Sequence, residues 1–181
     1  MNTVIRCAAL FFLLLSFSAF ATEKEIAFDG VMYKKVMEDF SSAIKIVEYI
    51  PENETAEKWR HKLSFRHYPH LSDARMAGAR LDNVLKQDPA NTVETSISRK
   101  DKDEAVVVYL RWTESSDYME YHITRYHHRE GVEGLVNYQF TFRFLEAREP
   151  QMAETVAQNK SRWTNALANS QWSLPEVFSK K

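Results

Sequence analysis

Strict alternation of apolar and polar residues is the feature that most constrains how this chain folds. It occurs in two segments, from Trp59 to His67 and from Leu135 to Leu145. In the second segment single polar residues separate the apolar ones, which are Val136, Tyr138, Phe140, Phe142 and Phe144. A period of two places alternate side chains on opposite faces of a strand, so both segments predict strands with one apolar and one polar face.

The rest of the chain predicts further strands and two helices. Strands are expected at 43–50, 93–98, 105–112 and 118–128, the last forming a hairpin with 135–145. A helix capped by Ser72 is expected at 73–86, with the apolar stripe Ala74, Ala77, Leu81, Val84 and Leu85. A second helix begins at Pro150, with the stripe Met152, Val156, Trp163 and Leu167. Residues 31–40 fit either a strand or a short helix.

This order of elements favours an α+β fold. We expect an antiparallel sheet of about five or six strands packed by two main helices, as an α/β/α-type sandwich. Residues 22–181 contain no internal repeat and no Pro/Gly/Ser-rich linker, so they predict a single domain. Trp59 is expected to be a buried anchor at the start of its strand, where truncation to Ala would cost ~3 kcal/mol or more.

Residues 1–21 predict a secretory signal peptide. Arg6 gives a positive start, an apolar run extends from Cys7 to Phe17, and Ala19-Phe20-Ala21 has the small-x-small cleavage pattern. The run is shorter than the ~20 residues of a membrane span, although an uncleaved anchor is the alternative. Cleavage removes the only cysteine. An exported chain without disulfides favours a bacterial periplasm, so we predict a periplasmic or secreted protein without a transmembrane segment.

Composition excludes several function classes. Lys and Arg number 24 against 25 Asp and Glu, so the chain lacks the basic excess expected of a nucleic-acid partner. Four glycines leave little room for phosphate-binding loops. The sequence has neither an H-E-x-x-H nor a G-x-S-x-G motif. The acidic residues Glu48, Glu52 and Glu54 could supply a glycosidase pair, but a solvated loop with capping roles is the favoured interpretation, because any chain with 25 acidic residues offers such pairs.

The six histidines are the most suggestive candidates for chemistry. They form two groups in the sequence, one at His61, His67 and His70 and the other at His122, His127 and His128. His67 and His70 have a plausible spacing for two metal ligands, and imidazole suits Zn or Cu. Structural or surface histidines without metal are the alternative, because a zinc site needs three or four ligands. No cofactor is otherwise expected.

Two surfaces are candidates for binding. Arg60, Lys62 and Arg66 share the polar face of one strand and could contact an anionic partner, although cross-strand acids could equally neutralise them. Aromatic residues are dense along the predicted sheet and form either a core layer or a ligand groove. They are Tyr109, Trp112, Tyr118, Tyr121, Tyr126 and Tyr138.

Two resemblances bear on function. The segment Glu48-Tyr49-Ile50-Pro51-Glu52-Asn53-Glu54-Thr55, followed by Trp59, resembles an E-Y-x-P-x-x-E-T-x-x-x-W pattern of small exported Gram-negative proteins of unassigned function. The order of elements is similar to that of the DcrB/PsbP/Mog1-like sandwiches, which implies a non-enzymatic binding or assembly role. Neither resemblance implies catalytic residues.

The sequence therefore predicts a non-enzymatic periplasmic protein that binds a protein or an envelope component. One alternative is a metal-binding protein or metal-dependent hydrolase that uses the histidines. Another is a carrier of a small ligand in an aromatic-lined cleft.

Overall fold

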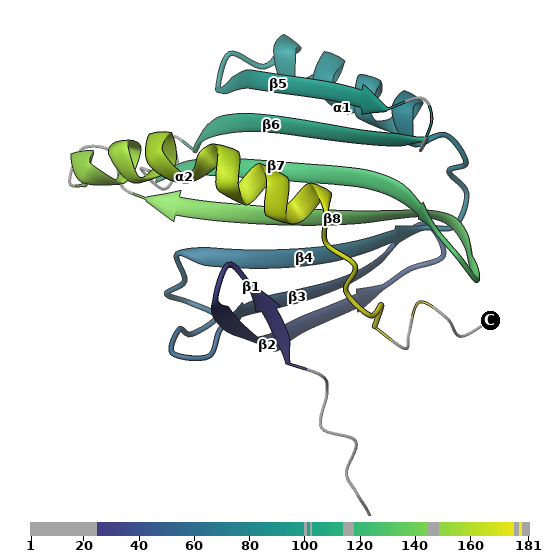
Figure 1. Cartoon of the computed structure of the whole chain (residues 1–181), viewed down its shortest axis with the longest axis horizontal. Coiled ribbons are helices and arrows are strands. Elements are labelled where there is room, and N and C mark those ends of the chain that lie inside the picture. Colours follow the sequence, from purple (N-terminus) through teal and green to yellow (C-terminus); the bar gives the residue numbers. More distant parts are fainter. Residues whose placement is uncertain are drawn as a thin grey trace, which may run out of the picture.

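A computed structural model describes residues 25–99, 101, 103–113, 118–144, 149–175 and 178. Within these ranges the chain forms one antiparallel sheet that curls into a half-barrel, with two helices (Figure 1). The signal peptide predicted at 1–21 lies outside the described residues. Among the described helices, none combines the length and the apolar character needed to span a membrane.

The sheet has eight strands in the order β1-β2-β3-β4-β8-β7-β6-β5. In chain order the strands are β1 (Ile26–Phe28), β2 (Val31–Phe40), β3 (Lys45–Pro51), β4 (His61–Tyr68), β5 (Asn91–Arg99), β6 (Glu104–Thr113), β7 (Tyr118–Arg129) and β8 (Val132–Phe144). The helices are α1 (Ala74–Gln87) and α2 (Pro150–Ala168). The predicted β7–β8 hairpin is confirmed, and β4 joins the two halves of the sheet by pairing with β8.

The sheet has more strands than the five or six predicted, because β1 was not foreseen and residues 31–40 had been left open between a strand and a short helix. Residues 31–40 form β2, and a short β1 pairs with its start. A bulge between Lys35 and Met37 shifts the register of β2 against β3, so the side-chain alternation changes phase in mid-strand. This change of phase removes the period-two pattern by which a strand is recognised in a sequence.

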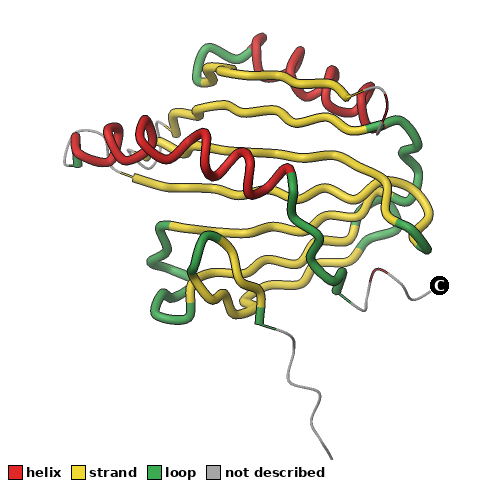
Figure 2. The backbone as a smooth tube through the Cα atoms, viewed as in Figure 1, coloured by secondary structure: helices red, strands yellow, loops and turns green. Residues whose placement is uncertain are grey.

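The inner face of the sheet, which faces α2, holds the main core. Trp163 of α2 lies 5.1 Å from Phe140 and 5.4 Å from Phe142, measured between ring centroids. The segment after α2 continues on the same side (Figure 2), and Trp172 packs 5.2 Å from Tyr138. Every apolar residue predicted for this side of β8 is buried. The predicted stripe of α2 is therefore confirmed as the face that meets the sheet.

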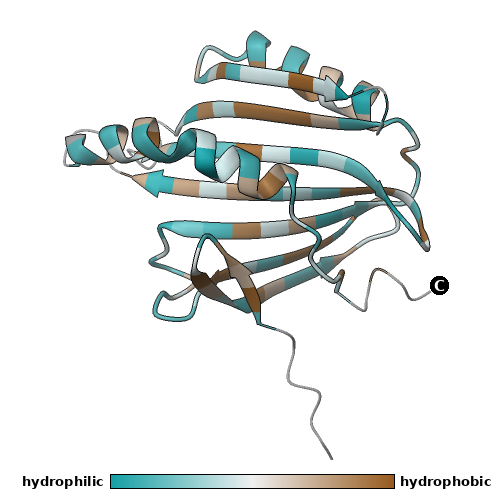
Figure 3. Ribbon diagram, viewed as in Figure 1, coloured by the Kyte–Doolittle hydropathy of each residue, from teal (hydrophilic) through white to brown (hydrophobic). Residues whose placement is uncertain are grey.

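The outer face, on the opposite side, is covered by α1 mainly over β5, β6 and β7. Leu85 packs with Val107 and Tyr109 of β6. A Cβ atom on Gly78 would lie 2.4 Å from the Cβ of Ala105, so the helix can approach β6 this closely only with glycine there. Figure 3 shows hydrophobic colour concentrated along β6, which is covered by a helix on both faces.

Two details of the predicted first helix are corrected. Asp73 is its N-cap, since the Asp73 side chain accepts a hydrogen bond from the backbone N–H of Met76 at 2.8 Å, in place of the expected Ser72. Val84 does not belong to the buried stripe, because 63% of it is exposed.

Candidate functional site

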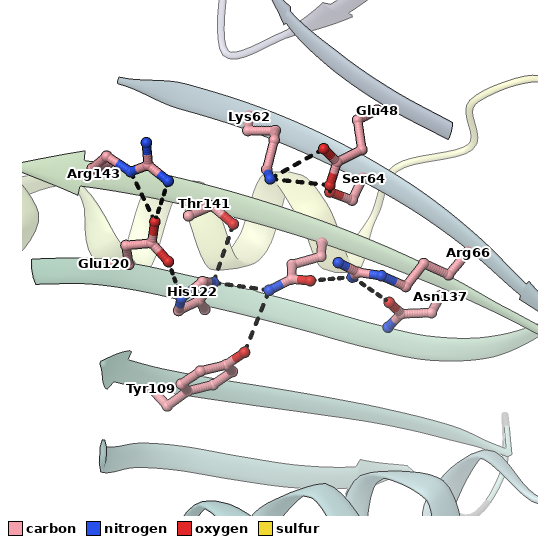
Figure 4. A network of polar contacts seen from close by, with 11 residues as sticks. Glu48, Lys62, Ser64, Arg66, Tyr109, Glu120, His122, Asn137, Thr141 and Arg143 are labelled. Atoms are coloured by element: carbon pink, nitrogen blue, oxygen red, sulfur yellow. Dashed lines mark hydrogen bonds and ion pairs between the residues drawn. The ribbon is translucent and has the colours of Figure 1, made fainter. Parts of the chain in front are cut away.

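A set of polar side chains lies on the outer face, on strands beside α1. Figure 4 shows these side chains on the sheet, with α2 behind it and α1 at one margin. We call this set the outer polar network, and its members are Glu48, Lys62, Ser64, Arg66, Tyr109, Glu120, His122, Asn137, Gln139, Thr141 and Arg143. They come from β3, β4, β6, β7 and β8. Strand alternation explains why they share one face.

Strand register brings complementary members of the network together. Lys62 lies opposite Thr141 and Arg66 opposite Asn137 in the β4–β8 pair. Glu120 lies opposite Arg143 in the β7–β8 pair. Directly opposite residues on one face lie close enough for their side chains to interact, so the network follows from the register once the strands are aligned.

Two ion pairs anchor the network at its margins. Lys62 Nζ lies 3.0 Å from a carboxylate oxygen of Glu48, and the Ser64 hydroxyl donates to the same carboxylate at 2.9 Å. Arg143 donates to Glu120 through Nε at 2.8 Å and through Nη2 at 2.7 Å. All four charged side chains are partly exposed, so these pairs border solvent.

His122 occupies the buried centre of the network. Its Nδ1 lies 2.8 Å from the Gln139 amide nitrogen and 3.1 Å from the Thr141 hydroxyl, and both groups can donate to it. This assigns the ring proton to Nε2, which lies 3.3 Å from a carboxylate oxygen of Glu120. Burial lowers the pKa of His122 against the opposing effect of Glu120, so the ring is neutral.

Glu120 is held ionised beside this ring. Burial alone would raise its pKa, but hydrogen bonds from His122 and Arg143, together with the positive charge of Arg143, hold the pKa well below its usual range. The connection of Glu120, His122 and Thr141 has the order of an acid–imidazole–hydroxyl triad. However, Thr141 is only 2% exposed and His122 7%, so a substrate cannot reach the hydroxyl. The arrangement therefore fixes side chains in place rather than presenting a nucleophile.

Arg66 differs from the other cations of the network. It donates to the amide oxygens of Asn137, at 3.3 Å, and of Gln139. Both acceptors are neutral, and no carboxylate within the described ranges forms an ion pair with Arg66. The Gln139 amide is oriented in turn by His122 and by the Tyr109 hydroxyl. The half-buried Arg66 guanidinium is thus held rigidly but not neutralised.

Trp59 lies beside the network and is not the core anchor that the sequence predicted. The Arg143 guanidinium stacks 3.6 Å from its ring centroid and the Lys62 ammonium lies 4.6 Å from it. Arg143 also lies 4.6 Å from the ring of Tyr118. Because β4 begins only at His61, the alternation of the strand does not extend back to Trp59. Its ring is therefore half-buried on the outer face.

The structure does not bring all three predicted binding residues into one site. Lys62 and Arg66 both belong to the outer polar network, whereas Arg60 pairs with Glu149 at the start of α2. The three acids considered for a glycosidase pair also have different surroundings. Glu48 belongs to the network, Glu54 accepts from the backbone N–H of Arg60 at 2.8 Å, and Glu52 is exposed.

The two candidate metal ligands have different surroundings. His67 lies on the inner face, 5% exposed, with Nε2 2.6 Å from the carbonyl oxygen of Glu133. His70 is exposed, and its Nε2 lies 3.2 Å from the carbonyl oxygen of Ser42. The part of the chain that the structure describes contains no group of three or more His, Cys, Asp or Glu residues able to hold a metal ion.

The aromatic residues that were considered as a groove lie on both faces of the sheet. Tyr121 and Tyr138 pack in the inner core, while Tyr109 and Tyr126 pack beneath α1. Sequence reasoning missed Glu120, Gln139, Thr141 and Arg143 as members of a site. Their polar alternation along β7 and β8 was visible, but the cross-strand partners that bury them depend on the register.

Comparison with known proteins gives a family but no activity. A family model matches residues 20–172, and the family is uncharacterised. No curated protein matches the chain. No solved structure matches it either.

Proposed function

The chain belongs to the uncharacterised family whose model matches residues 20–172, and from this premise we propose that it is a non-enzymatic binding protein of the periplasm. Its outer polar network binds an anionic group on a protein or an envelope component. The observation that carries this proposal is the Arg66 guanidinium, which is held by two neutral amide oxygens and lacks a carboxylate partner among the described residues.

The surroundings of Arg66 favour an anionic ligand. A guanidinium recognises a carboxylate or a phosphate through two parallel hydrogen bonds, and it is always charged. Here Gln139, His122 and Tyr109 fix the orientation of the Arg66 side chain before any ligand arrives. Binding then loses little side-chain entropy, which increases affinity.

Neighbouring residues extend the binding surface beyond a single charge. Trp59 and Arg143 lie stacked together, and Tyr118 lies against the same guanidinium. Trp, Tyr and Arg are the residue types that most often dominate the binding energy of protein interfaces. The resemblance to the DcrB/PsbP/Mog1-like sandwiches stays a prediction, and it agrees with a binding role.

Site-specific photo-crosslinking in the producing cells tests this proposal. A photoreactive phenylalanine analogue at position 59 replaces the aromatic ring that packs on Arg143 and Lys62 of the outer polar network by another aromatic ring, so we expect a discrete adduct with an envelope component. Arg66→Met should reduce that adduct at least about tenfold, because it removes the charge that pairs with the ligand.

Arg80→Met is the matched control, since Arg80 is exposed on α1 and the substitution makes the same change of charge. The control should leave the adduct unchanged. Absence of any adduct from position 59, or equal loss with both substitutions, would contradict the proposal.

A further inference from the structure

The β5 edge of the half-barrel is open. β5 ends the strand order and pairs only with β6, so its outward backbone N–H and C=O groups pair with no other strand of the described chain. The middle of the strand, Thr95-Ser96-Ile97-Ser98, contains neither a charge nor a proline. Edge strands in soluble proteins are usually protected by such residues, because an open edge accepts a further strand.

The opposite edge is protected along more of its length than β5. β1 pairs with the first part of β2, from Val31 to Tyr33. Beyond that point β2 carries Lys34, Lys35 and Glu38, together with a bulge between Lys35 and Met37. Charges and bulges are the usual means of blocking edge-to-edge pairing. β5 has these features only near its ends, with a bulge and Glu94 near the start and Arg99 at the finish, so its middle from Thr95 to Ser98 is left open.

Two hollows flank β5, one on each face of the sheet. The first, of about 400 Å³, lies between α1 and β5 on the outer face. The second, of about 260 Å³, lies between α2 and the inner face, next to Glu94 and Thr95. Successive side chains of a strand point to opposite faces. A strand added beside β5 would therefore direct alternate side chains towards the two hollows.

The lining of each hollow indicates which side chains fit. The outer hollow has an apolar part formed by Met76, Gly78, Ala79 and Ala105, and Met76 is 52% exposed. Charged side chains also line it, namely Asp73, Arg75 and Asp82. The inner hollow is lined mainly by polar residues, which are Glu94, Thr95, Lys160, Ser161, Thr164 and Asn165 beside Val108 and Tyr121. The apolar part of the outer hollow suits an aliphatic side chain, and the inner hollow suits polar side chains.

We propose that β5 binds an extended segment of a partner protein by strand addition, with aliphatic side chains towards α1 and polar side chains towards α2. The backbone hydrogen bonds supply affinity and the two hollows supply specificity, as in other cases of strand addition. This site lies at the edge of the sheet, so it is separate from the outer polar network and does not depend on the function proposed for that network.

The β5 strand of a second copy of this chain would fit this edge less well than a segment of a partner protein. In the register with β6, Ser96 and Ser98 share the outer face with Val107 and Ala105. The β5 strand of a second copy would therefore offer serine side chains to the apolar outer hollow and leave it unfilled. A heterologous segment with Val, Leu or Ile at alternate positions fills it.

Selection from a phage-displayed library of random heptapeptides on the purified protein tests the proposal. We expect enriched peptides that alternate aliphatic and polar residues. Binding should slow amide hydrogen exchange of residues 94–98, whose outward groups become hydrogen-bonded. Met76→Lys should weaken the selected peptides about tenfold or more, because it replaces the exposed apolar side chain of the outer hollow by a charge.

Val84→Lys is the matched control, because Val84 is also exposed on α1 but does not line the hollow. It should leave peptide binding unchanged, and thermal unfolding should show that both variants fold. Peptides without alternation, failure to enrich any peptide, or protection at β2 instead of β5 would overturn the inference. Concentration-dependent dimerisation that Met76→Lys abolishes would assign the edge to a second copy and would also overturn it.

Discussion

The two faces of β8 show two ways of burying side chains in one sheet. Phe140 on the inner face is 1% exposed and lies 5.1 Å from the Trp163 ring of α2, measured between ring centroids. Thr141 and Gln139 on the outer face are 2% and 7% exposed, although they belong to a polar network on strands beside α1. On the inner face α2 covers the side chains of β8. On the outer face these polar side chains of β8 are buried by hydrogen bonding with neighbouring side chains of the sheet.

This difference predicts different energetic roles for the two faces. Apolar burial stabilises the fold in proportion to the area removed from water and has little directional preference. A hydrogen-bonded polar network contributes less net free energy but fixes the orientation of its members. We therefore expect the inner face to determine stability and the outer face to determine binding, and three measurements test that division.

The largest effect is expected for Trp163→Ala on the inner face. Trp163 is 4% exposed, packs on Phe140 and Phe142, and donates from its indole N–H to Asp29 at 2.8 Å. Its truncation should lower the free energy of unfolding by ~4 kcal/mol, because it leaves a cavity beneath α2. Urea denaturation followed by far-UV circular dichroism measures the change. A loss below ~1 kcal/mol would mean that α2 contributes little to the core.

Sequence periodicity was sufficient to predict the inner face. The alternation of β4 and β8 and the stripe of α2 each repeat with the period of their own element, so one segment at a time reveals the buried side. Burial of Leu63, Phe65, Phe140 and Trp163 confirms that reasoning. At β2 the same reasoning could not choose between a strand and a short helix, because the bulge between Lys35 and Met37 shifts the alternation.

The outer face could not be predicted to the same degree. Asn137, Gln139 and Thr141 were correctly assigned to the face opposite the apolar residues of β8. Their burial follows from partners on β4, β6 and β7, and the register that aligns these strands is a property of the whole sheet. Trp59 illustrates the same limit, because its contacts with Arg143 and Lys62 join residues from different segments.

The pH dependence of stability should separate His127 of the inner face from Glu120 of the outer face. On the inner face, burial, assisted by the charges of Arg125 and Arg129, lowers the pKa of His127 to about 4. The unfolded chain binds this proton below pH ~6.5, so stability should fall by up to ~3 kcal/mol as the pH drops from ~6.5 to ~4. On the outer face, the lowered pKa of Glu120 acts in the same direction, because the unfolded chain again binds the proton more readily, but its contribution is lost only below pH ~4.5.

His127→Gln tests whether His127 causes the loss of stability as the pH falls below ~6.5. Unfolding midpoints in urea between pH 7.5 and 4.5 should fall less steeply in the variant than in the unaltered protein. The slope should not vanish, because burial also lowers the pKa of His61 and of His122. Identical slopes in the two proteins would show that His127 is not held neutral by burial.

The smallest effect is expected for Trp59→Ala on the outer face. A buried tryptophan would cost several kcal/mol, but this ring is half-buried and held by two cations, Arg143 and Lys62. Each exposed cation–π contact contributes ~0.5–1 kcal/mol, so the free energy of unfolding should drop by only ~1–2 kcal/mol. The same urea denaturation measures it beside Trp163→Ala. A loss as large as that of Trp163→Ala would mean that the outer face also carries the stability of the fold, and the division between a stabilising face and a binding face would fail.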